Sequence, residues 1–216
     1  MSIQIVGTDS AGVLSVDETM KAASVSTRPS MTPHIGWTSL GVKSGVISLI
    51  AAAGPVFAFR NIGENFILIR RIGIGVIQTN AFGTPQKLDF SLNVARHWFG
   101  SDSGGTATSV VSNFGKHRTG LETPNGLDIR ISSGTALGAG TRVVDANALS
   151  IVGAWAGGVG ELIPRVSDNL FGHSLGDYPL VFRQNEGFLV LNATLMGAGG
   201  GAVIDLSMEF AELETY

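Results

Sequence analysis

Few residues in this 216-residue chain stand at the spacings that metal binding or catalysis needs. The four histidines, His34, His97, His117 and His173, are spread along the chain, and no His-x-His or His-Glu-x-x-His motif occurs. Zinc sites usually draw their ligands from such short motifs. The absence of cysteine excludes disulfides and thiolate metal sites. We therefore expect no metal and no other cofactor, and we interpret the histidines as surface or interface residues.

Three short strings resemble motifs of enzymes or nucleotide sites, but each lacks an essential part. "GIGVIQ" (73–78) begins like a dinucleotide-binding loop, yet it ends in Gln78 and no helical pattern follows. "GAGGG" (197–201) lacks the Lys-Ser/Thr pair of a phosphate-binding loop. "SDSGG" (101–105) differs from the serine-protease string Gly-Asp-Ser-Gly-Gly at its first residue, and nothing around it supports a protease fold. We therefore predict that the chain is not an enzyme.

Arginines and aromatic residues are the side chains that the sequence offers for binding. Arg70 and Arg71 interrupt the most apolar stretch of the chain. Because consecutive strand residues face opposite sides, one of the two must point toward a covered face or an interface. Glu64 or Glu186 could neutralise it within the chain, and the alternative is a contact between subunits. The candidate interface residues are Pro29, Pro33, His34, Trp37, Arg70, Arg71, Trp98 and Trp155. For the last two of these, a place in the core is the competing interpretation.

The elements that must position these residues are β-strands. Hydrophobic residues make up 44% of the chain and charged residues 14%, against roughly 25% charged residues in typical soluble domains. Either Ser, Thr, Asn and Gly form much of the surface, or partners cover part of it. The net charge of −3 gives no reason to expect nucleic acid as a partner. Gly54 and Pro55 break the longest apolar stretch, so we also expect no membrane span.

Strand patterns follow one another from about residue 46. Residues 65–78 are dense in Ile, Leu and Val, with Gly73 and Gly75 as expected bulge or bend points. Residues 87–99 alternate between apolar and polar side chains, which predicts a half-buried strand.

The end of the chain has the clearest pattern. Residues 187–197 are apolar on both faces in their first half, as in a central strand that is covered on both sides. Residues 204–210 alternate, and the glycines at 197–201 between these two strands indicate a hairpin loop.

The predicted fold is all-β: a jelly roll or related antiparallel β-sandwich of residues 46–216, preceded by an extended N-terminal arm of residues 1–45. The arm is assigned because residues 1–45 show no sustained period of 2 or 3.6. It is either a flexible tail or a segment that orders against a neighbouring subunit.

Seven strings occur in a fixed order between residues 66 and 213: FILIRRI (66–72), LDFSLNVAR (88–96), SDSGGTA (101–107), NFGKHRT (113–119), DIRISSGTALGAGTRVVDA (128–146), YPLVFRQNEGFLV (178–190) and MEFAEL (208–213). Together they resemble a family of small proteins encoded among the structural genes of tailed bacteriophages and prophages. The chain departs from that family at Phe210, where a Trp is common, and its first 50 residues match poorly.

The resemblance implies a structural protein of the virion, made in the cytoplasm of the host bacterium. We expect a capsid decoration (cement) protein on the capsid surface, which binds copies of itself, as a trimer, and the major capsid protein. The alternative is a receptor- or glycan-binding module of the phage tail or head fibre, for which the loops at 101–118 and 166–178 would supply the contacts. A hydrolase of cell-wall sugars is the least favoured hypothesis, because no catalytic constellation is visible.

Overall fold

The chain forms two units in its computed structural model, one of residues 1–31 together with residue 216 and the other of residues 32–215. In the first unit, β1 (Val16–Asp17) and β2 (Ala22–Ala23) pair as antiparallel strands. The residues that the structure describes are 16–17, 22–23, 37–108, 115, 126–138, 140–160, 165–172 and 179–213.

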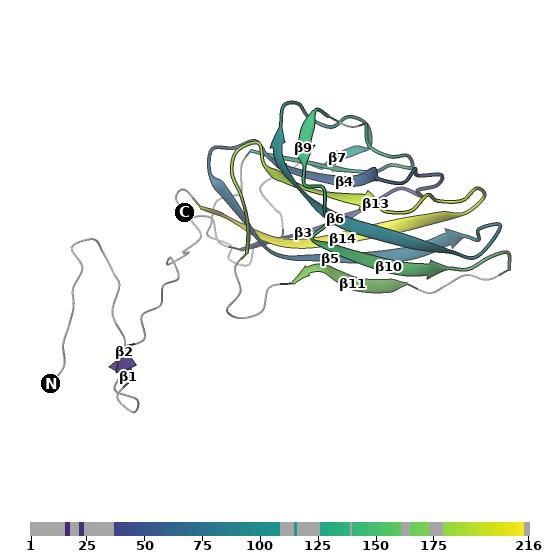
Figure 1. Ribbon diagram of the computed structural model, residues 1–216, viewed down its shortest axis with the longest axis horizontal. Helices are drawn as coiled ribbons and strands as arrows, with labels where there is room; N and C mark the ends of the chain where they lie inside the picture. The colour runs from purple at the N-terminus through teal and green to yellow at the C-terminus, as the bar shows by residue number, and fades with distance from the viewer. Residues whose placement is uncertain are drawn as a thin grey trace. The chain divides into compact units, whose positions relative to one another are not determined.

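The second unit consists of two antiparallel sheets that pack as a sandwich, and its described residues contain no helix (Figure 1). The large sheet has seven strands in the order β10 (Ser150–Ala156), β6 (Gln86–Trp98), β13 (Gly187–Asn192), β4 (Gly54–Asn61), β8 (Leu127–Ile131) and β7 (Thr106–Thr108), with β9 (Arg142–Val144) beside β6. The small sheet has five, in the order β11 (Val166–Gly172), β5 (Phe66–Asn80), β14 (Gly201–Leu213) and β3 (Thr38–Lys43), with β12 (Leu180–Phe182) beside β5.

The pairing of the eight principal strands is nested along the chain. β3 pairs with β14, β4 with β13, β5 with β11, and β6 with β10, and every pair is antiparallel. Among these eight strands, the chain changes sheet at every step from β3 to β6, and again at every step from β10 through β11 and β13 to β14. This is one long antiparallel hairpin rolled into two sheets, the topology of a jelly roll. The predicted all-β sandwich is confirmed.

Two segments, one at each end of the sandwich domain, differ from the sequence-based expectation. Thr38–Lys43, placed in the N-terminal arm by the sequence analysis, form β3 and pair with β14, with Leu40 only 1% exposed. The expected arm of residues 1–45 therefore overlaps the sandwich. The glycine-rich segment at 197–201 is not a hairpin loop, because β13 lies in the large sheet and β14 in the small one. Residues 193–200 instead cross from one sheet to the other.

An aromatic cluster joins the two sheets at the centre of the core. The ring of Phe59 on β4 stacks on the ring of Phe188 on β13, with the ring centroids 5.2 Å apart. Both strands belong to the large sheet. From the small sheet, Phe210 approaches Phe59 edge-on at 6.1 Å and Phe182 lies at 6.5 Å. Offset and edge-on contacts of this kind add to the stabilisation that burial alone provides. This cluster fixes the position of one sheet on the other.

A second, smaller core lies on the outer face of the large sheet, beneath the long connection between β6 and β10. In β13, Phe188 and Val190 belong to the main core, whereas Leu189 between them belongs to the second one. The strand is therefore covered on both faces, as its sequence predicted. The buried members of this second core are Ala58, Ala95, Trp98, Leu137 and Leu189.

Candidate functional site

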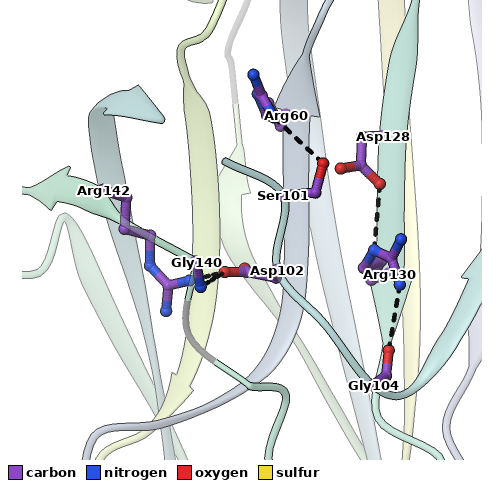
Figure 2. Close-up of polar contacts among 8 residues, drawn as sticks. All are labelled: Arg60, Ser101, Asp102, Gly104, Asp128, Arg130, Gly140 and Arg142. Atoms are coloured by element: carbon purple, nitrogen blue, oxygen red, sulfur yellow. Dashed lines mark hydrogen bonds and ion pairs between the residues drawn. The ribbon is translucent and has the colours of Figure 1, made fainter. Parts of the chain in front are cut away.

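The string "SDSGG" folds into a cluster of polar contacts that anchors the connection between β6 and β10 (Figure 2). Asp102 is buried, with 3% of its surface exposed. Its Oδ1 accepts a hydrogen bond from the backbone N–H of Gly140 at 2.6 Å and forms an ion pair with Arg142 of β9. Burial of the Arg142 guanidinium lowers its pKa from the ordinary value, and the charge of Asp102 opposes that shift. The loop after β6 is thereby tied to β9.

The rest of the cluster holds the same loop against the large sheet. Arg60 donates to Oγ of Ser101 at 3.3 Å, and Arg130 donates to the carbonyl of Gly104 at 3.4 Å (Figure 2). Gly105 has a φ of +61°, and a Cβ there would lie 2.4 Å from the carbonyl oxygen of Ile131. The space enclosed by these groups has no room for a water-sized molecule. We therefore assign the cluster a structural role. This role explains why Ser, Asp and Gly stand at these positions of the string SDSGG (101–105).

A polar hollow of about 620 Å³ lies on the outer face of the small sheet. One cross-strand row beneath it consists of Gly41 on β3, Ser207 on β14 and Gly73 on β5. The glycines leave the row without bulky side chains, and a Cβ added to Gly41 would have no atom within 4 Å. The hollow follows from this open space on the sheet face.

Charged side chains lie around the hollow. The next row contains Lys43, Asp205 and Gly75, and a Cβ on that glycine would lie 2.9 Å from the guanidinium of Arg165. Arg165 forms a loose ion pair with Asp205 at 3.6 Å. At the other end, Arg71 donates from Nε to Oδ1 of Asn169 at 3.1 Å. The hollow therefore presents both hydrogen-bond donors and acceptors to solvent.

Sequence reasoning did not find this hollow, although one signal for it was present. Gly73 and Gly75 are two residues apart and so leave the same face of their strand bare. The sequence analysis interpreted them as bulge or bend points. The pairing of β14 with β5 continues without a shift through both positions. The contribution of Gly41, from a strand far away in sequence, has no local signal.

The pairing of β5 with β14 shifts register at two other places, near Thr79 and at the two arginines. The register with β14 passes from Ile69 opposite Phe210 to Arg71 opposite Glu209, which leaves Arg70 as an extra residue. An extra residue interrupts the alternation of faces, so neither arginine has to enter the core. Within the chain, Arg70 is half-buried and Arg71 exposed, so neither lies in the core. A contact of these arginines with another subunit stays a prediction.

The partners of these arginines are also different from those expected. Arg70 donates to Oε2 of Glu209 from Nε at 2.8 Å and from Nη2 at 2.5 Å, and its guanidinium lies 4.8 Å from the ring centre of Trp37. Neither of the predicted partners, Glu64 and Glu186, pairs with it. Trp37, Arg70 and Glu209 form one contact group in the small sheet, and Trp37 is half-buried in it.

The edge strand β10 is the second surface of interest. It is an outermost strand of the large sheet, and none of its residues, Ser150–Ala156, is charged or a proline. Its register with β6 is regular over all seven residues. Ile151 is 62% exposed and Trp155 54% exposed, with Leu149 just before the strand at 50%. At the start of the strand, Ser150 donates from Oγ to the carbonyl of Leu170 on β11, so this end lies against the other sheet. The uncharged, apolar stretch from Ile151 to Trp155 is the part of the edge suited to pairing with another chain.

The other edges of the sandwich are protected in ways that β10 is not. β11 carries Asp168 and is interrupted by a bulge between Asn169 and Phe171. β3 has its edge partly covered, since the backbone N–H of Ser39 donates to the carbonyl of Gly115 at 2.9 Å. β7 is only three residues long. Charges, bulges, covering segments and short length are the usual protections of an edge.

The predicted interface residues have different locations. Trp155 is exposed on β10. Trp98 is only 2% exposed and packs in the second core, so it is not an exposed contact residue, and the competing interpretation, a place in the core, is the correct one for it. Pro29, Pro33 and His34 lie outside the described residues.

Within the described part of the chain, no group of three His, Asp or Glu residues is placed to hold a metal ion. Nor does that part contain a helix long and apolar enough to cross a membrane. No protein-family model matches the chain, and no curated protein matches it.

Proposed function

We propose that this chain is a structural protein of a tailed-bacteriophage particle, a decoration (cement) protein that stabilises the capsid from its surface. Its action is association with copies of itself, as a trimer, and with the major capsid protein, without a catalytic step. The observation that carries the proposal is the uncharged edge strand β10 with its exposed Ile151 and Trp155. The ordered strings that resemble phage structural proteins indicate the type of particle.

Association would remove the unfavourable features of this edge. An exposed strand edge leaves backbone N–H and C=O groups without strand partners, and a neighbouring chain can pair with them. Exposed apolar side chains add free energy when they are buried, at about 25 cal/mol per Å². Tryptophan is enriched among the residues that contribute most to protein interfaces. Many copies on a lattice sum such modest contacts into strong attachment.

Binding to capsids tests the role of the edge. Purified protein is mixed with expanded phage capsids, and the bound fraction is measured after sedimentation. Ile151→Lys adds a charge to β10 and should abolish co-sedimentation and self-association. Ile62→Lys, at a position that is 43% exposed and outside the strands, is the matched control and should bind like the wild type. Wild-type protein that stays in the supernatant, or an Ile151→Lys variant that binds fully, would contradict the proposal.

Imaging of intact virions tests the location. The proposal expects density for this protein on the head lattice, with β10 against a neighbouring subunit. Density confined to the tail tip or to fibres would favour the alternative function.

That alternative is a receptor- or glycan-binding module of the tail or head fibre on the same fold. The polar hollow on the small sheet is the observation in its favour. Of the loops expected to bind, 101–118 is described at residues 101–108 and 115. The second, 166–178, is described at 166–172, where the structure has the strand β11 and not a loop. Within the first, Asp102 is committed to the anchoring contacts of the connection. Adsorption of the labelled protein to host cells, without capsids, is the measurement that distinguishes this function from the first.

A further inference from the structure

We infer that the hollow on the outer face of the small sheet is a binding site for an anionic oligosaccharide. The argument uses the row that contains Gly41 and Gly73, the ammonium of Lys43, the terminal nitrogens of Arg71, and the acceptor Asp205. It goes beyond the decoration function and does not depend on it, because the hollow and the β10 edge lie on different sheets.

The charges around the hollow favour an anion. Three basic side chains, Lys43, Arg71 and Arg165, line it together with Asp168 and Asp205. Asp205 pairs with Arg165, and Asp168 accepts a hydrogen bond from the backbone N–H of Asn169 at 2.7 Å. No hydrogen bond or ion pair within the described residues occupies the ammonium of Lys43 or the terminal nitrogens of Arg71. Each of these two groups is therefore available to bind one carboxylate of a ligand.

The spacing of the two cations indicates a ligand longer than one sugar ring. Arg71 lies opposite Glu209 on one side of β14, and Lys43 lies opposite Asp205 on the other. With neighbouring strands about 4.8 Å apart and a rise of about 3.4 Å per residue, their Cα atoms are separated by roughly 16 Å. The volume of about 620 Å³ is within the range of small-molecule sites.

The groups between the cations favour a saccharide over a peptide. A sugar hydroxyl both donates and accepts hydrogen bonds, and so is best satisfied by a mixture of acceptors and donors. Asp205 supplies carboxylate oxygens, while Ser207 and Ser167 supply hydroxyls. At Gly41 no atom lies within 4 Å of where a Cβ would be, so a sugar ring can approach the sheet closely there, beside the hydroxyl of Ser207. An acidic peptide would use the cations but has less need of the acceptors.

Calorimetric titration of the full chain at low ionic strength tests the inference. The probe is trigalacturonic acid, with neutral maltotriose and a triglutamate peptide as comparisons. We expect saturable binding of trigalacturonic acid that weakens as salt is added. Maltotriose and triglutamate should each bind at least about tenfold more weakly, since each lacks one of the two required features.

Two variants locate the binding in the hollow. Gly41→Val places a β-branched side chain in open space on the hollow's floor, so it should abolish binding with little change in thermal stability. Gly83→Val, at another open glycine outside the hollow, is its control. The double variant Lys43→Gln/Arg71→Gln should weaken binding more than tenfold, on the order expected for two lost charged hydrogen bonds. Lys87→Gln, on the large sheet, should bind like the wild type.

Each other outcome overturns the inference. If no heat of binding is detected up to millimolar trigalacturonic acid, the hollow is not a binding site for it. Equal affinity for maltotriose would remove the requirement for an anion, and equal affinity for triglutamate would remove the requirement for a sugar. Full binding by the Gly41→Val variant would move the site elsewhere on the protein. Since all these measurements use the isolated protein, they stay separate from the capsid experiments.

Discussion

The outer face of the large sheet is covered by the chain's own connection from β6 to β10, which buries Trp98 and Leu189 against it. On the small sheet, Gly41 and Gly73 lie beneath an open polar hollow instead. Both faces are built by the same alternation of side chains along strands. Around Trp98 and Leu189 the chain supplies its own cover, whereas the outward positions of the small sheet around Gly41 carry glycines, serines and charges without one. The cover of the large sheet does not extend to β10, where Ile151 and Trp155 are exposed. The covered face contributes stability, and the bare face is available for recognition.

The largest test of this comparison is removal of the tryptophan beneath the connection. Trp98→Ala should lower the free energy of unfolding by about 3–5 kcal/mol, because it leaves a large cavity in the second core. Trp155→Ala, at a 54% exposed position on the same sheet, should cost well under about 1 kcal/mol. Urea denaturation of both variants measures the two values. Equal losses would mean that the connection does not form a core of its own.

The buried ion pair under the same connection should have the next largest effect. Asp102→Ala leaves the guanidinium of Arg142, whose side chain is 8% exposed, without its charged partner. We expect a loss of about 3 kcal/mol, as is typical when one member of a buried pair is removed. Replacing both residues by leucine should recover part of this loss, and chemical denaturation of the single and double variants measures it. If the losses of unfolding free energy from the two single replacements simply add up in the double variant, Asp102 and Arg142 are not coupled, and the prediction is contradicted.

On the bare face, the ion pair between Arg70 and Glu209 should contribute less. Their side chains are 39% and 23% exposed, so solvent screens the interaction. Glu209→Gln should cost about 1 kcal/mol of unfolding free energy, at the upper end for such pairs because the bulge holds Arg70 in place. Thermal denaturation of the Glu209→Gln and Asp102→Ala variants, measured side by side, compares their losses of unfolding free energy. A loss as large as that of Asp102→Ala would break the contrast between the faces.

The smallest effect is expected at the exposed pair of Arg96 and Asp145. Hydrogen bonds from Arg96 hold the pKa of the Asp145 carboxyl below its ordinary value. The pair therefore adds stability above the unfolded-state pKa, and this stability is lost as the pH falls through the folded-state pKa. Asp145→Asn should cost no more than about 0.5 kcal/mol at neutral pH and nothing below the folded-state pKa. Denaturation at the two pH values checks the sign, and a cost that grew on acidification would refute it.

The main elements of the fold were predictable because their signals are local. Phe188, Leu189 and Val190 are apolar on both faces of one strand, and that strand is indeed buried on both sides. β3 escaped the analysis because it offers only Leu40 and Val42 as alternating apolar residues, and it is held in place by β14 at the other end of the chain. The bulge at Arg70 escaped for a related reason, since register depends on the partner strand and not on the sequence of one strand.

The candidate site was harder to predict than the fold. The hollow brings together Lys43, Arg71 and Asp205 from three strands and Arg165 from just before β11, and these residues have no common motif. Trp98 is of a residue type that is common at interfaces. It is buried in the second core because Leu137, 39 residues further along the chain, packs in the same cluster. In both cases, contacts between distant segments decide the role of the side chain.

The position of β14 also determines when the protein can acquire its structure during synthesis. The strand lies between β5 and β3 and pairs with both, yet it is translated after every other strand of the sandwich. While the ribosome still holds it, β3 has no neighbour in its sheet, and the apolar faces of the earlier strands lack a partner. Folding of the small sheet is therefore completed only after translation of β14, and the nascent chain has to be shielded from aggregation until then.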